Sequence, residues 1–135
     1  MPLFEWNENL SVKVKELDEQ HKKLISIIND LHDAMRQRKT KDILNDIING
    51  LISYTETHFS TEEKYFEQFY YDMTLPHKNE HKNFVKKVLD FKKGFDENRM
   101  MLSMDIMNFL KDWLTGHING RDKEYSAFFN DKGLY

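Results

Sequence analysis

The stretch HFSTEEKYFEQFYYDMTLPHKNEH, residues 58–81, carries two pairs of candidate metal ligands. His58 and Glu62 stand four residues apart, and so do His77 and His81. On an α-helix, a step of four residues leaves two side chains on one face, about 6 Å apart along the axis. Each pair is therefore predicted to form a two-point metal clamp, of the kind found in HxxxH zinc sites.

A break in the chain places the two clamps on different helices. Pro76 directly precedes His77, and proline is favoured in the first turn of a helix. We therefore expect the second clamp to open a new helix after a short connection. One clamp of this spacing is common on surface helices, whereas two clamps on neighbouring helices indicate a site much more strongly.

Composition favours a single all-helical domain with a large core. The 135 residues include five glycines, two prolines and eighteen aromatic side chains, but no cysteine. Without cysteine the chain has no disulfide, no iron–sulfur ligation of its own and no thiol nucleophile. The formal net charge of −3 provides no basic field for nucleic acid or anionic lipid. We therefore expect no nucleic-acid partner.

The sequence also predicts a cytoplasmic protein without membrane insertion. Its start, MPLFEWNENL, lacks the charged and apolar regions of a secretory signal. No apolar run approaches the length that spans a membrane. Because no long exposed apolar seam is evident, we expect a monomer.

Apolar periodicity predicts an all-α fold, an up-down-up-down four-helix bundle with an N-terminal arm and a short C-terminal helix. One domain spans residues 1–135, with the arm over 1–17, the bundle over 18–119 and a C-terminal segment over 120–135. Asp18 is expected to cap the first helix. The predicted helices span about 18–37, 41–69, 76–95, 101–119 and 123–129.

Alternating helix direction is expected to bring five histidines to one end of this bundle. His21 lies early in the first predicted helix and His58 late in the second. His77 and His81 lie early in the third helix, and His117 lies late in the fourth. Because successive helices run in opposite directions, all five positions converge. Imidazoles with a few carboxylates favour a borderline transition metal over calcium or magnesium, which prefer oxygen ligands.

Asp122 is the second candidate carboxylate, five residues after His117. In an unbroken α-helix it would point about 140° away from the His117 face. We expect Asn119 and Gly120 to end the helix, since glycine adopts the left-handed C-terminal conformation cheaply. The redirected backbone would then return Asp122 to the site.

With these motifs in place, the sequence resembles a single-domain bacterial hemerythrin. The resemblance covers nearly the whole chain and combines several motifs. These are LDEQHKKL around His21, HFSTEE from His58, HKNEH over residues 77–81 and WLTGHINGRD around His117.

The resemblance implies a non-heme diiron site with an oxide or hydroxide bridge. Seven residues match the family's ligand pattern: His21, His58, Glu62, His77, His81, His117 and Asp122. The last three histidines would hold one iron and the first two the other, with both carboxylates bridging. At about six coordination positions per ion, these ligands and the bridge leave one position open, on the two-histidine iron, for a small ligand such as O₂.

The implied function is reversible O₂ binding for storage, transport or delivery, without enzymatic turnover. A dry apolar pocket is expected, because water and protons promote loss of peroxide and leave inert ferric iron. The residues that match the family's oxygen pocket are Leu24, Phe59, Trp113, Leu114 and Ile118.

Two other functions compete with oxygen binding. A diiron enzyme, such as a ferroxidase, a peroxidase or a nitric-oxide-handling protein, ranks second. Oxygen-activating diiron bundles use four carboxylates and Glu-x-x-His motifs, whereas this chain has His-x-x-x-Glu and two carboxylates. An oxygen or iron sensor ranks third, because 135 residues leave no room for an output domain. The sequence does not identify a protein partner.

Several other residues are expected to lie outside the site. His32 is predicted to be a core or rim histidine, because it lies about 16 Å along the helix from His21. Lys13 and Tyr70 stand where the family often has glycine, and Phe66 where it often has methionine. Four methionines are expected to fill gaps in the core rather than bind copper: Met100, Met101, Met104 and Met107.

Overall fold

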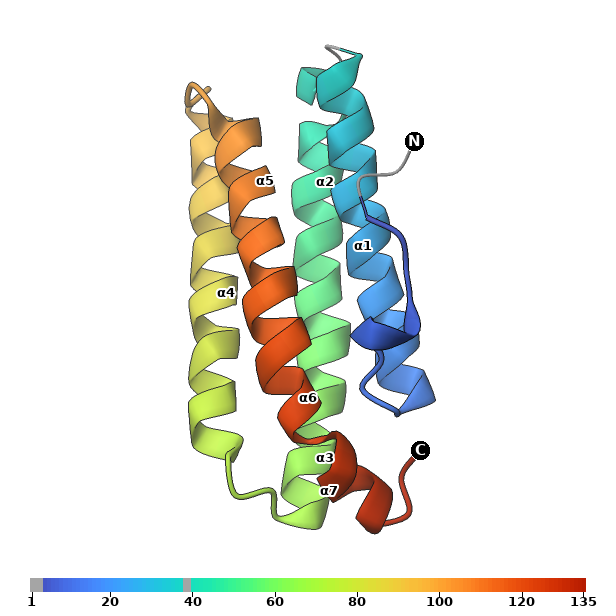
Figure 1. Cartoon of the computed structure of the whole chain (residues 1–135). Coiled ribbons are helices and arrows are strands. Elements are labelled where there is room, and N and C mark those ends of the chain that lie inside the picture. The colour runs from blue at the N-terminus through green and yellow to red at the C-terminus, as the bar shows by residue number, and fades with distance from the viewer. Residues whose placement is uncertain (1–3, 38–39) are drawn as a thin grey trace.

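The computed structural model describes residues 4–37 and 40–135, and the predicted all-α four-helix bundle is confirmed (Figure 1). The bundle has four columns. The first is α1, the second is α2 followed by η2 and α3, the third is α4, and the fourth is α5 followed by η3 and α6. Pro76 lies in the first turn of α4, as expected. The helices are α1 (Lys15–Arg36), α2 (Thr40–Tyr54), α3 (Ser60–Phe69), α4 (Thr74–Asp96), α5 (Leu102–Asp112), α6 (Asp122–Glu124) and α7 (Ser126–Asp131), with a 3-10 turn η1 (Glu8–Leu10) and two π-helical segments, η2 (Thr55–Phe59) and η3 (Trp113–Arg121).

Helix α1 begins three residues earlier than predicted, and Asp18 does not cap it. The N-cap is Val14, whose side chain makes no capping hydrogen bond. The Asp18 carboxylate instead accepts hydrogen bonds from the Ser11 hydroxyl at 2.6 Å and the Val12 backbone N–H at 2.8 Å. Asp18 therefore ties the N-terminal arm to the first turn of α1, where a negative charge also suits the helix dipole.

The N-terminal arm lies along one side of the bundle and covers the core there. Asn29 on α1 accepts a hydrogen bond from the backbone N–H of Phe4 at 2.9 Å and donates one to its carbonyl at 2.8 Å. Phe4, Trp6 and Leu10 pack against the main core. The ammonium of Lys22 lies 5.1 Å from the centre of the Trp6 ring, a cation–π contact that holds the arm further.

Two hydrophobic cores meet at the level of the predicted ligand histidines. The larger core fills the bundle, and Tyr54 from it stacks on His58. In the smaller core, the Phe66 ring lies 4.8 Å, centroid to centroid, from the His77 ring. The smaller core consists of Val12, Val14, Leu17, Phe66, Tyr71, Tyr125 and Phe129.

The π-helical segment η3 turns Asp122 back to the His117 face. The backbone N–H of Asp122 donates to the His117 carbonyl, an i→i+5 hydrogen bond. A π turn contains more residues than an α turn, so the offset of about 140° expected in an α-helix is reduced and Asp122 returns to the His117 side. The predicted stop at Asn119 and Gly120 was wrong, because the helix continues through both residues to Glu124 and Gly120 has no positive φ.

The π-helical segment η2 has a comparable effect in the second column. Tyr54 and Thr55 are both buried, and so are His58 and Phe59. Adjacent residues of an α-helix point about 100° apart, whereas the wider π turn lets both members of each pair face inward. The segment thus delivers a predicted ligand and a predicted pocket residue from neighbouring positions.

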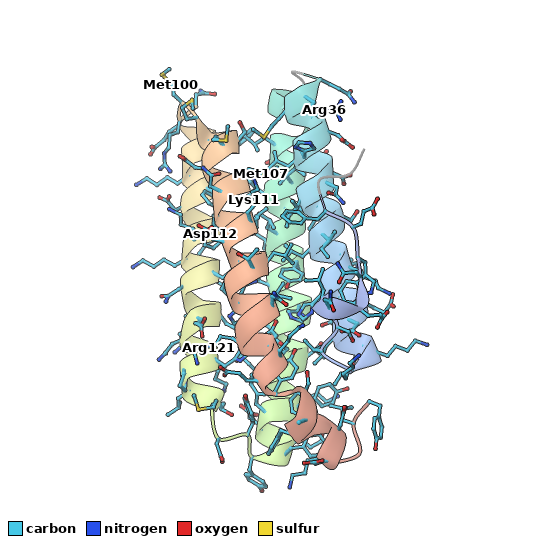
Figure 2. All side chains as sticks on the ribbon, viewed as in Figure 1. Arg36, Met100, Met107, Lys111, Asp112 and Arg121 are labelled. Atoms are coloured by element: carbon cyan, nitrogen blue, oxygen red, sulfur yellow. The ribbon has the colours of Figure 1, made fainter. Side chains whose placement is uncertain are left out.

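The methionine prediction holds for only one of the four residues. Met107 is 4 % exposed and belongs to the main core. Met100, Met101 and Met104 are exposed, and Figure 2 shows Met100 at the tip of the bundle, at the opposite end from Arg121. Met100 and Met101 lie in the α4–α5 connection and Met104 in the first turn of α5, so all three stand at the end of the core.

Lys13 and Tyr70 have left-handed backbones. Their φ angles are +60° and +57°. A β-carbon in this region costs about 1–2 kcal/mol. The Tyr70 side chain is 87 % exposed, so packing does not offset the strain.

Replacing Tyr70 with glycine is expected to stabilise the protein by about 0.5–1 kcal/mol, because relief of strain exceeds the added entropy of the unfolded chain. Urea unfolding of the metal-free protein measures the change. Asn98→Gly is the matched control, because Asn98 has φ +55° and asparagine already tolerates this region. Equal gains from the two substitutions would show that Tyr70 is not strained.

Candidate metal centre

All seven predicted ligand side chains meet in one buried cluster, and each is 4 % exposed or less. Each of the five histidines presents its Nε2 atom to a carboxylate. The convergence predicted from alternating helix direction is therefore present. The seven residues are His21 from α1, His58 from η2, Glu62 from α3, His77 and His81 from α4, His117 from η3 and Asp122 from α6.

Glu62 faces histidines from two columns of the bundle. Its Oε1 atom lies 3.2 Å from His58 Nε2, 3.0 Å from His81 Nε2 and 3.8 Å from His77 Nε2. Its Oε2 atom accepts a hydrogen bond of 2.5 Å from the Tyr125 hydroxyl. This bond fixes the carboxylate and directs Oε1 toward the histidines.

Asp122 bridges the other histidines with both of its oxygens. Oδ1 lies 2.8 Å from His77 Nε2 and 3.0 Å from His117 Nε2. Oδ2 lies 3.0 Å from His21 Nε2 on α1. The carboxylate therefore faces imidazoles from three different columns.

The donor atoms form two overlapping groups, each with its atoms within 4.8 Å of one another. The first group is Glu62, His77, His81, His117 and Asp122. The second group is His21, His58, Glu62 and Asp122. Both carboxylates belong to both groups, an arrangement that suits two neighbouring metal ions with three and two histidines. Among the described residues, neither group includes His32.

The unmet hydrogen bonding of this cluster fits metal ligation. Burying a polar atom without a partner costs about 1–3 kcal/mol, so such atoms are rare. Six such atoms lie together in this cluster, at ion-pair distances from one another but not aligned for hydrogen bonds. These six are Nε2 of His77, His81 and His117, Oε1 of Glu62 and both carboxylate oxygens of Asp122. Imidazole and carboxylate donors directed in this way fit borderline transition metals.

The carboxylates and imidazoles of the cluster shift one another's pKa. Burial alone would lower the pKa of His77, but Asp122 and Glu62 raise it to about 10, and the pKa of His117 is raised in the same way. Burial alone would raise the pKa of both carboxylates, but the histidines hold the pKa of Glu62 and of Asp122 below its ordinary value. The pKa of His58 is lowered, because burial outweighs Glu62. A raised histidine pKa means that protons compete with a metal ion for His77 and His117.

Two histidines of the three-histidine group are backed by carboxylates. His81 Nδ1 lies 2.9 Å from Glu63 Oε2, and His117 Nδ1 lies 3.2 Å from Glu80 Oε1. Arg121 holds Glu80 in turn, at 2.7 Å. A carboxylate that accepts the Nδ1–H fixes the tautomer with Nε2 free and raises the basicity of the ring.

On the two-histidine side, His58 is backed by a neutral amide. Its Nδ1 atom donates to Gln20 Oε1 at 2.6 Å, and the Gln20 amide donates to Thr61 Oγ1 at 3.1 Å. An amide oxygen orients the ring but increases its basicity less than a carboxylate does. The two halves of the centre therefore differ in donor strength as well as in histidine number.

The comparisons with known proteins agree with this geometry. The family model described as "Hemerythrin HHE cation binding domain" matches residues 12–129. The chain belongs to the hemerythrin family. The bacteriohemerythrin of Clostridium acetobutylicum is 32 % identical over 127 residues, which cover 91 % of this chain and 98 % of that protein. The hemerythrin-like protein of Naegleria gruberi is 33 % identical over 124 residues, which cover 92 % of each chain.

Solved structures of the family have the same fold. A crystal structure of a hemerythrin L114A mutant matches with a TM-score of 0.84 at 29 % identity, covering 94 % of this chain and 97 % of that one. An L114Y mutant matches with a TM-score of 0.79 at 28 % identity.

Three residues that contact the predicted ligands were not assigned to the site from sequence. They are Tyr125, Gln20 and Glu80, and none of them is a predicted ligand. The signal that identifies Tyr125 is structural, because a fully buried tyrosine hydroxyl needs a hydrogen-bond partner. Glu63 also contacts a predicted ligand, His81.

Glu63→Gln is expected to weaken metal binding about 10–100-fold, because the amide reduces the basicity of His81. Calorimetric titration with Co²⁺, whose visible spectrum also reports ligation, measures the affinity. Glu67→Gln on the same helix is the control, since the Glu67 carboxylate is 70 % exposed and contacts only Lys78. If both variants bind Co²⁺ as tightly as the parent, Glu63 does not tune His81.

Proposed function

We propose that this hemerythrin-family protein binds two iron ions and binds O₂ reversibly, for storage, transport or delivery. The observation that carries the proposal is the pair of buried carboxylates shared by a three-histidine group and a two-histidine group. A reduced iron pair, when bound, supplies the electrons that O₂ accepts and later returns. The group with fewer histidines leaves its ion a position for a small ligand.

The residues proposed to hold the iron pair form the same two groups as the clustered donor atoms. His77, His81 and His117 would hold one ion, and His21 and His58 the other. The two carboxylates, Glu62 and Asp122, would bridge the ions. The proposal is supported by the distances from each carboxylate to histidines of more than one column.

The proposed oxygen pocket is an apolar wall that contacts histidines of both groups, since Phe59 stacks on His81 at 3.8 Å and lies 5.8 Å from His58. Its residues are 9 % exposed or less and all lie in the main core. Such a wall keeps water from the ligand position, which slows irreversible oxidation. The five residues are Leu24, Phe59, Trp113, Leu114 and Ile118.

The donor set supports oxygen binding in preference to enzymatic oxygen activation. Oxygen-activating diiron bundles use four carboxylates, whereas this cluster has two carboxylates and five imidazoles. We therefore propose that the protein is not an enzyme.

A cytoplasmic location is also proposed. The absence of cysteine is compatible with a reducing compartment. Over residues 4–37 and 40–135, no helix has the length and apolar character that crossing a bilayer requires.

Oxygen binding is tested by loading the protein with iron, reducing it without air, admitting O₂ and then removing it. We expect a nearly colourless form that gains visible absorption bands with O₂ and loses them under vacuum over repeated cycles. Bands that decay directly to ferric protein while peroxide is released or consumed would overturn the proposal in favour of an oxygen-activating enzyme.

Leu114→Ala is expected to speed autoxidation while the iron content stays at about two per chain, because a smaller side chain admits water to the pocket. The substitution also costs about 2–5 kcal/mol of stability. The rate of decay of the oxygenated absorption measures autoxidation. Leu110→Ala is the matched control, since Leu110 is fully buried in the same column but outside the proposed pocket. Equal acceleration by both would show that general loosening, not loss of the shield, is responsible.

A further inference from the structure

A buried hydroxyl lies beside the two-histidine group and has no role in the contacts described above. Tyr54 is the last residue of α2, directly before η2, and its side chain is 5 % exposed. Its ring stacks on His58, with centroids 5.0 Å apart and planes 15° apart. It also packs edge-on against Phe59, at 5.9 Å. Tyr54 therefore contacts both a proposed ligand of the two-histidine ion and a proposed pocket residue.

The Tyr54 hydroxyl has no hydrogen-bond partner. Buried tyrosine hydroxyls nearly always have a hydrogen-bond partner. The Tyr125 hydroxyl, for example, donates to Glu62. The ring of Tyr54 also borders a cavity of about 260 Å³ between α1 and α2, but its hydroxyl is closed to solvent. Bulk water from that cavity therefore does not satisfy the hydroxyl.

A second unpartnered donor lies in the same wall. The Nε1 atom of Trp113 is buried and makes no hydrogen bond. The Trp113 ring packs on His117 at 3.8 Å and lies 5.9 Å from Phe59. Phe59 thus lies between two aromatic rings that each carry an unused N–H or O–H group.

The Tyr54 hydroxyl can donate at neutral pH, because a tyrosine is protonated there at its ordinary pKa. Burial raises the pKa of Tyr54 further and the charges of Asp122 and Glu62 act in the same direction, whereas the Trp113 side chain, which reaches the hydroxyl, lowers it. As a packing element a phenylalanine would serve better, because a buried hydroxyl without a partner costs about 1–3 kcal/mol.

We propose that the Tyr54 hydroxyl, with the Trp113 indole N–H beside it, donates a hydrogen bond to a small ligand bound on the two-histidine side. This inference rests on the proposed function and adds a residue that determines ligand specificity. Because the hydroxyl can donate and the indole N–H can only donate, the two groups favour a ligand that carries negative charge over a neutral one of similar size. The proposed pocket is then apolar for most of its wall but polar where the ligand ends.

The test compares Tyr54→Phe with the parent, using azide as the anionic probe of the oxidised iron-loaded protein and nitric oxide as the neutral probe of the reduced protein. The azide Kd is expected to rise about tenfold, the typical effect of losing a hydrogen bond to a charged group. The nitric oxide Kd is expected to change by less than about twofold. The azide stretching frequency of the parent is expected to shift between H₂O and D₂O, and this shift is expected to vanish in Tyr54→Phe.

Two further measurements separate a ligand contact from a packing role. The metal-free Tyr54→Phe protein is expected to unfold at no lower urea concentration than the parent, since it loses only an unpartnered hydroxyl. Tyr71→Phe is the matched control, because Tyr71 is buried in the smaller core and lies outside the pocket. It is expected to leave the azide Kd unchanged.

An unchanged azide Kd and an unchanged isotope shift in Tyr54→Phe would overturn the inference and leave the proposed function intact. A parent protein that takes up iron but binds neither azide nor O₂ would overturn the proposed function, and the inference with it.

Discussion

Two carboxylates buried among five imidazoles are the constraint on which the rest of this structure depends. Glu62 and Asp122 are fully buried, and an unpaired buried charge costs several kcal/mol. Histidines from all four columns of the bundle must therefore meet them at one level. The large core on one side and the aromatic cluster around Phe66 on the other hold the columns at that level. Packing and charge compensation thus fix the same arrangement, and neither suffices without the other.

Regular helices alone would not bring these groups together. The π-helical segments η2 and η3 lie in the two columns that supply His58 and the His117–Asp122 pair. Such segments are rare and are frequently found at functional sites. A wide turn weakens the local hydrogen-bond ladder, and the rotation it introduces places two inward side chains where an α-helix would place one. The chain therefore accepts local irregularity in the two columns that supply His58 and the His117–Asp122 pair.

The helix pattern and histidine positions predicted the bundle and the seven clustered residues, because both depend on periodicity and helix direction. Periodicity did not predict the path to Asp122, because at 3.6 residues per turn Asp122 reaches the site only after a helix stop. Periodicity also did not identify Gln20 and Glu80, whose side chains contact a clustered histidine on a neighbouring column. Such contacts depend on the rotation of one helix relative to another, which a single sequence does not give. Asp18 was mistaken for a cap, because its partners in the arm lie outside the helical pattern.

The order in which the ligands occur along the chain has a consequence for how the centre is assembled in the cell. His117, Asp122 and Tyr125 are translated after every other residue of the cluster. Until they emerge from the ribosome, the nascent chain offers Glu62 without the tyrosine that fixes it and without the second carboxylate. The first three helical columns, which are translated earlier, therefore carry only an incomplete set of the clustered side chains. The full set is assembled only when the last column docks against them.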